Sequence, residues 1–261
     1  MVAGFPVDAG DCLISFDRLH YGKLAAGEGG RVPAYAGYEV TRRSQGIDPQ
    51  TERLLSPLRV AGLRRFEPDA IDIDSRGAGC FIARATAGNI ILMRTRFRPE
   101  DGEGGAGRLH QQSAIWVGSF ESWRRNPAAC LAVAAQELRA DPDHALERDA
   151  LRLNDAPLRW RVAQPDCAAV ARIVERAPWA HAMLRLLVEE AESGADSLLD
   201  FGAADFPTER EFLAAVGFAL QFLPTAYPRW AEISVASGFA QSLPGLCLRY
   251  SPSWRQARAA A

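Results

Sequence analysis

Two small groups of side chains in the sequence could carry catalytic chemistry. Cys80 and His110 lie near the starts of separate predicted strands, and a thiol beside an imidazole could form a nucleophile–base pair if these strands were neighbours. Asp72 and Asp74 are separated by a single isoleucine, so on a strand their carboxyl groups would share one face. Such a pair could bind a divalent cation or raise the pKa of one carboxyl group. The ordinary interpretations are a buried cysteine and a solvated strand face.

The sequence contains no motif that assigns a cofactor or a metal ion. Residues 102–107, GEGGAG, match the letters of a dinucleotide-binding loop, but acidic residues precede them and a predicted strand follows, whereas that loop must open a helix. The five cysteines never form CxxC pairs, and the four histidines have no second ligand at helical spacing. A P-loop sequence is also absent. We therefore expect no cofactor and no metal site.

Arginine supplies nearly all of the positive charge, and several arginines are candidates for binding a partner. Arg94, Arg96 and Arg98 alternate with other residues along a predicted strand, so they could line one face of it. A basic face of this kind would also suit nucleic acid, but the formal net charge of -2 gives no overall attraction to phosphate. The interaction candidates are Tyr38, Arg94, Arg96, Arg98, Arg108 and His110.

The elements that position these residues are predicted mainly as strands in the first part of the chain. Two apolar runs separated by the turn at 87–89 predict a hairpin within a β section that runs from about 70 to 118. A helix should begin after Ser119 and cover this sheet, because apolar residues then recur on one face. The expected strands are 11–19, 36–42, 79–86, 89–97 and 108–118, with a short helix near 54–58.

The second part of the chain is predicted to be richer in helix. Residues 167–194 have a helical pattern that is broken near Pro178. Thr208 and Glu211 match a capping box, which predicts a helix over 208–223. Prolines end that helix, and the apolar segments after it should pack beneath it as strands. The expected strands of this part are 197–203, 230–238 and 246–250.

Length and composition predict a globular α+β protein. The 261 residues, 48% hydrophobic and 24% charged, are enough for one large or two modest domains. No apolar run approaches the ~20 residues needed to cross a bilayer, and the first residues lack the pattern of a signal peptide, so we expect a cytoplasmic protein. The expected division is a β-rich N-terminal domain with a covering helix at 1–142, a linker at 143–157 and a helix-rich α/β C-terminal domain at 158–261.

Three segments of the chain together resemble one known family. A first strand, a glycine–tyrosine strand and a serine–glycine turn follow one another at Tyr21, Gly22, Gly37, Tyr38, Ser44 and Gly46. A glycine–arginine loop then leads to a histidine-bearing strand at Gly107, Arg108 and His110, and residues 212–238 form an apolar helix that ends in Leu-Pro before a strand. These segments are similar to the N-terminal and middle regions of the GTPase-associated protein 1 family. The resemblance implies a bacterial accessory or adaptor protein, without an established catalytic centre, that works with GTPases or ATPases.

The sequence therefore favours a non-enzymatic protein–protein adaptor or accessory subunit over an enzyme. The expected partner is a protein, a GTPase or an ATPase, and neither a membrane nor nucleic acid is expected. In an adaptor, one surface should combine exposed apolar or aromatic residues with arginine, because such residues dominate the energetics of interfaces. The alternative is a hydrolase that uses His110 with Cys80, or with Asp72 and Asp74.

Overall fold

The chain folds as a mixed α+β protein. The computed structural model describes residues 7–24, 37–59, 79–86, 88–99, 109–131, 152–155, 157–165, 178–193, 195–202, 205–206, 209–238 and 243–251. Within them the strands are β1 (Val7–Leu24), β2 (Gly37–Ser44), β3 (Gly79–Thr86), β4 (Asn89–Pro99), β5 (Leu109–Ser119), β6 (Arg152–Asp155), β7 (Leu158–Pro165), β8 (Ser197–Phe201), β9 (Ile233–Ser237) and β10 (Leu246–Tyr250). The helices are α1 (Pro49–Arg59), α2 (Phe120–Arg125), α6 (Pro178–Ser193) and α7 (Glu209–Leu220), and a short 3₁₀ turn, η3 (Trp230–Glu232), precedes β9.

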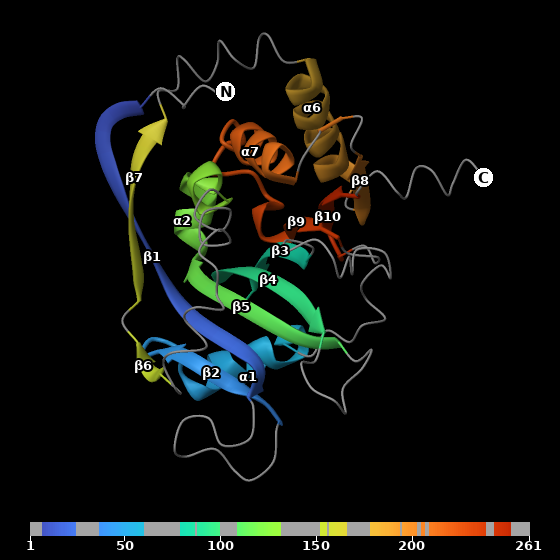
Figure 1. The fold of residues 1–261 in the computed structure, drawn as a ribbon. Coiled ribbons are helices and arrows are strands. Elements are labelled where there is room, and N and C mark those ends of the chain that lie inside the picture. Colours follow the sequence, from blue (N-terminus) through green and yellow to red (C-terminus); the bar gives the residue numbers. More distant parts are fainter. Residues whose placement is uncertain are drawn as a thin grey trace, which may run out of the picture.

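All ten strands belong to one sheet, which Figure 1 shows running through the molecule. The strand order is β6-β2-β1-β5-β4-β3-β9-β10-β8, and β7 also pairs with β1. β1 is longer than the predicted strand at 11–19, and this length lets it pair with β7 along its first half and with β5 and β2 along its second half. At the other end of the sheet, β9, β10 and β8 are parallel to one another.

Strands from both predicted parts of the chain meet where β3 pairs antiparallel with β9. β6 lies inside the interval predicted to be a linker, and it pairs with β2. β7, which the sequence did not predict as a strand, follows it and pairs with β1. One sheet thus spans both parts, and the division into two domains stays a prediction.

The hairpin of β3 and β4 confirms the clearest strand prediction. Thr86 pairs with Asn89 across the turn, and Gly88 has a φ of 79°, a left-handed value that suits glycine. β4 then pairs with β5 without any shift from Asn89–Ser119 to Pro99–Leu109. Because no bulge interrupts this ribbon, the face on which each of its residues lies follows directly from the register.

The two faces of the sheet carry two separate apolar cores. Ile90 and Leu92 of β4 point to the face covered by α2, α6 and α7, called the α7 face below. Ile91 and Met93, which alternate with them, point to the opposite α1 face, where Leu55 of α1 covers them. Both cores contain fully buried side chains from the two predicted parts of the chain.

α2 begins where the sequence predicts, directly after Ser119, whereas α1 extends beyond the predicted helix near 54–58 at both ends. Ser119 caps α2, and its hydroxyl accepts a hydrogen bond from the Ser122 main-chain N–H at 3.1 Å. Asn126, at φ -139° and ψ 59°, interrupts the helix, and Pro127 opens a second helical segment at 127–131. α7 lies within the predicted 208–223, and β9 and β10 follow it as predicted. Thr208 of the proposed capping box lies outside the described residues.

No helix among the described residues has both the length and the apolar character that crossing a bilayer requires.

Candidate functional site

The strand register decides which of the predicted catalytic residues could meet. Cys80 pairs with Thr95, and Thr95 pairs with Ser113, which places the Cys80 position on the α1 face. His110 pairs with Arg98 on the α7 face. The two positions therefore lie on opposite faces of the sheet, and this arrangement argues against a nucleophile–base pair. Asp72 and Asp74 lie outside the described residues.

The predicted arginine row does share one face, but its first member is buried. Arg94, Arg96 and Arg98 occupy alternate positions of β4 on the α7 face, and Arg98 is the cross-strand partner of His110. The Arg94 side chain is only 7% exposed and forms an ion pair with Glu209 of α7. Its two terminal nitrogens donate to the two carboxylate oxygens at 3.0 and 2.7 Å. Arg94 thus joins the sheet to α7 inside the molecule.

The remaining interaction candidates do not add to that face. Tyr38 lies two positions from Val40 on β2, so the two positions share one face. Val40 packs against the core on the α1 face, which places the Tyr38 position there too. Arg108 lies outside the described residues. Among the residues that the structure describes, no group of three or more His, Cys, Asp or Glu side chains is placed to hold a metal ion.

A different feature stands out at the end of the sheet, where β8 is the last strand. Within the described part of the chain, β8 pairs only with β10. The Ser197 N–H donates to the Gly245 carbonyl at 2.9 Å, and the Ser251 N–H donates to the Phe201 carbonyl at 2.8 Å. Because main-chain groups alternate in direction along a strand, those of Leu198 and Asp200 point away from β10 to the outer edge.

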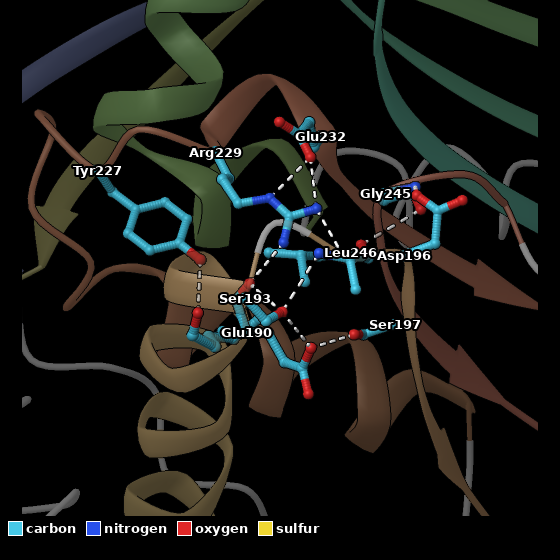
Figure 2. A network of polar contacts seen from close by, with 12 residues as sticks. Glu190, Ser193, Asp196, Ser197, Tyr227, Arg229, Glu232, Gly245 and Leu246 are labelled. Carbon is cyan, nitrogen blue, oxygen red and sulfur yellow. Dashed lines mark hydrogen bonds and ion pairs between the residues drawn. The ribbon is translucent and has the colours of Figure 1, made fainter.

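A network of polar contacts fixes the start of β8 (Figure 2). The buried guanidinium of Arg229 donates to the carbonyls of Glu190 and Ala195 at 2.6 and 2.9 Å, and it pairs with Glu232 at 2.6 Å. The Asp196 carboxylate accepts the Gly245 N–H at 2.8 Å. A cation at the carbonyl end of α6 also stabilises the helix dipole. These contacts hold the end of α6 and the start of β8 together.

Two further contacts attach the network to the rest of the fold. The Ser197 hydroxyl donates to the Glu190 carboxylate, which ties β8 to the last turn of α6. The Tyr227 hydroxyl donates to the Leu187 carbonyl at 2.6 Å (Figure 2). Burial raises the pKa of Tyr227, so this phenol stays a neutral donor.

A second polar group fixes the end of β8. Arg249 of β10 binds both carboxylate oxygens of Asp200, at 3.1 and 2.6 Å, and the Ser251 hydroxyl donates to the same carboxylate at 2.7 Å. The Arg249 side chain is 8% exposed, whereas that of Asp200 is 39% exposed. Polar contacts therefore hold the outermost described strand at both ends.

Apolar side chains are exposed on β8 and on the helix that leads into it. Among the described residues, the exposed large apolar side chains are Leu186 at 36%, Val188 at 48% and Leu198 at 39%. Arg185, also exposed, adjoins Leu186 on α6. Leu198 pairs with Cys247 of the core on the α1 face, whereas α6 covers the α7 face, so Leu198 and the exposed residues of α6 lie on different faces of the sheet. None of these residues was a predicted site residue. The alternating segment SLLDF was the signal available for β8, but sequence does not show which strand is outermost.

Comparison of the chain with family models, with curated proteins and with solved structures gave no match. The fold and the site therefore define only a class: an α+β protein with one mixed sheet and exposed apolar side chains on its last described strand and on α6.

Proposed function

We propose that the chain is a non-enzymatic protein–protein adaptor, an accessory subunit of a larger assembly. The observation that carries the proposal is a set of exposed apolar side chains: Leu198 on β8, the last strand of the described sheet, and Leu186 and Val188 on α6, the helix that leads into it. Exposed apolar groups on a rigid frame favour association, because their burial against a partner is favourable and costs little ordering of the adaptor itself. The register places the Cys80 and His110 positions on opposite faces of the sheet, which favours the adaptor over a hydrolase with a thiol–imidazole pair. The pairing of His110 with Asp72 and Asp74 stays a prediction.

The partner we propose follows from the family resemblance. It is a subunit of a bacterial, cytoplasmic, multi-component system linked to a GTPase or an ATPase. In this proposal the β-rich first part, with its covering helix, is the platform, and the helix-rich second part presents the exposed apolar side chains.

The test is recovery of a partner from cells that make the chain natively. The tagged chain should retain one protein in stoichiometric amount after gentle crosslinking. The double variant Val188→Glu/Leu198→Glu should lose this protein, because both substitutions put charge on exposed apolar positions. Arg159→Glu is the matched control, because Arg159 is also exposed but lies on β7, which pairs with β1 far along the strand order from β8. A partner that the double variant still retains, or turnover of a small molecule by the purified chain, would contradict the proposal.

A further inference from the structure

We propose that a row of residues on the α1 face binds an extended segment of a partner protein, with a basic side chain at one end of the segment and an acidic side chain at the other. The row crosses four neighbouring strands. Asp17 of β1 pairs with Val117 of β5, and Val117 pairs with Ile91 of β4. Ile91 in turn pairs with Arg84 of β3. Opposite charges therefore stand at the two ends of the row, with two apolar side chains between them.

The row is separate from the surface that carries the proposed function. Beyond Arg84 the same register continues through Ser234 and Cys247 to Leu198. Ser234 and Cys247 are each only 1% exposed, so they interrupt the accessible surface between Arg84 and Leu198. The inference thus goes beyond the proposed function, because it gives the adaptor a second surface with its own chemistry.

Neither charge of the row is neutralised within the described part of the chain. Arg84 is half-buried, and no described carboxylate forms an ion pair with it. Asp17 is also half-buried, and the donor that the described structure gives to its carboxylate is the neutral N–H of Gly46. Burial accordingly raises the pKa of Asp17. A partner that brings the opposite charge to each end would offset this cost.

The Asp17 carboxylate is held in place before any partner arrives. It lies so close to Gly46 that a Cβ at that position would overlap with it. The next residue, Ile47, is buried in the core on the α1 face, which anchors the turn that carries Gly46. Because the carboxylate is already ordered, binding a cation there costs little conformational entropy of the chain itself.

The spacing of the two charges fits an extended segment that crosses the strands. Neighbouring strands lie about 4.8 Å apart, so the three steps from Asp17 to Arg84 span about 14 Å. In an extended chain, residues i, i+2 and i+4 point to one side, and i and i+4 are about 13 Å apart. A basic residue at i would face Asp17, an apolar residue at i+2 would contact Val117, and an acidic residue at i+4 would face Arg84.

Polar side chains beside the row are available to the main chain of such a segment. Ser15 lies two positions before Asp17 on β1, and Asn89 lies two positions before Ile91 on β4, so both share the face of the row. Ser15 is exposed and Asn89 is half-buried. A hydroxyl and an amide each donate and accept hydrogen bonds, which suits the N–H and C=O groups of a passing segment.

A second copy of the chain fits the row less well than a segment does. A half-turn about an axis parallel to the strands would set Asp17 of each copy opposite Arg84 of the other, so the charges alone would allow a dimer. However, α1 covers the same face next to the row, where Leu55 is buried in the core. Because a helix is about 10 Å across, the two α1 helices would meet before the two rows could touch. A narrow segment beside α1 meets no such obstacle.

The experiment measures binding of a fluorescent peptide to the full chain by anisotropy. The peptide is Lys-Thr-Val-Thr-Glu with blocked ends. Its matched control, Val-Lys-Thr-Glu-Thr, has the same composition, but its charges are two positions apart and cannot reach both ends of the row together. We expect saturable binding of the first peptide that weakens with salt, and binding of the control that is about five-fold weaker.

Variants of the chain identify the row itself. Arg84→Glu should prefer Lys-Thr-Val-Thr-Lys to Lys-Thr-Val-Thr-Glu, whereas the native chain should have the opposite preference. A reversed preference cannot result from a loss of folded protein. Asp17→Asn keeps the shape of the side chain and should no longer distinguish lysine from glutamine at the first position of the peptide. Arg125→Glu is the matched control, because it changes the net charge equally at a 68% exposed side chain of α2, and it should keep the native preference.

Several results would overturn the inference. They are failure of the native chain to bind the first peptide, equal affinity for the two charge spacings, and an Arg84→Glu variant that keeps the native preference. A dimer of the native chain that the peptide dissociates would assign the row to a second copy instead. The adaptor proposal fails separately, when no partner is recovered from cells. If the peptide results hold in that case, the row binds a segment of this chemistry and the adaptor proposal alone is wrong.

Discussion

Arg94 and Glu209 form a two-pronged ion pair, with nitrogen–oxygen distances of 3.0 and 2.7 Å, between the middle of β4 and the first residue of α7. The two residues are 115 positions apart in the sequence, and each comes from a different predicted part of the chain. Glu209 also lies in the first helical turn, where a negative charge stabilises the helix dipole. The pair therefore fixes where α7 begins on the sheet.

Removing one partner of this pair should destabilise the fold more than removing both. In Glu209→Gln the buried guanidinium loses the Glu209 carboxylate, and because that carboxylate is itself 27% exposed we expect the free energy of unfolding to fall by about 2 kcal/mol, less than for a fully buried pair. In the double variant Arg94→Met/Glu209→Gln no buried charge remains, so most of that loss should be recovered. Urea unfolding of the three proteins measures both quantities. A double variant no more stable than Glu209→Gln would show that the pair does not act as a unit.

The Arg229 clamp depends on the planar fork of arginine. Its guanidinium reaches the carbonyls of Glu190 and Ala195 and the Glu232 carboxylate at the same time. A lysine has a single ammonium group and cannot span these three acceptors. Arg229→Lys should therefore lower the free energy of unfolding by about 2 kcal/mol, because buried acceptors lose their donors.

Arg185→Lys is the matched control for the clamp. Arg185 pairs with Glu189 at 3.2 Å, but its side chain is 78% exposed. Exposed pairs contribute little, so this variant should unfold within about 0.5 kcal/mol of the native chain. Equal losses in the two variants would mean that the contacts of Arg229 contribute no more than those of a surface arginine.

Local signals allowed much of the fold to be predicted, whereas the candidate site depended on contacts that no local signal reveals. The β3–β4 hairpin, the start of α2 at Ser119 and the α7 helix follow from turn residues, caps and apolar runs within a few positions. The pairing of β3 with β9 and the outermost position of β8 depend on strands distant in sequence. The separation of Cys80 from His110 likewise requires the register of three strands.

Two glycines with left-handed backbones should respond differently to alanine. Gly245 has a φ of 87°, and a Cβ there would lie 2.5 Å from the Glu232 carbonyl oxygen. Gly88 has a φ of 79°, but a Cβ there would meet nothing within 4 Å. Gly88→Ala should cost only the left-handed backbone, about 1 kcal/mol, and Gly245→Ala should cost clearly more because the main chain must also move. Thermal unfolding distinguishes them, and similar melting temperatures would contradict the steric explanation.

Ionisation of Asp17 should lower the stability of the fold as pH rises. Burial raises the pKa of this carboxyl group, and the hydrogen bond from the Gly46 N–H only partly opposes the rise. The folded state therefore binds the Asp17 proton more tightly than the unfolded state, so this group lowers stability as pH rises from its ordinary pKa through the raised value. Urea unfolding measures the difference in stability between Asp17→Asn and the native chain at pH 3.5 and at pH 7. This difference should favour the variant more at pH 7 than at pH 3.5.

Asp48 provides the control with the opposite sign. The Thr51 N–H donates to its carboxylate at 2.7 Å, and this bond lowers the pKa of Asp48. Its contribution to stability is present above the ordinary pKa and is lost as pH falls through the lowered one. The difference in stability between Asp48→Asn and the native chain should therefore disfavour the variant more at pH 7 than at pH 3.5. If both variants changed in the same direction, burial of Asp17 would not be the cause of its behaviour.

Neither predicted domain should fold alone, because one sheet spans both and each of its two apolar cores contains residues from both. β9 separated from β3 would expose a fully buried strand, and β1 would lose β7 along its first half. Chains of residues 1–142 and 158–261 should each lack cooperative thermal unfolding, since each lacks part of the apolar core on the α7 face. Mixed together, the two chains should recover a transition only if residues 143–157, which contain β6, are joined to one of them. A single half that unfolds cooperatively would instead support two independent domains and would make the β3–β9 pairing a contact between them.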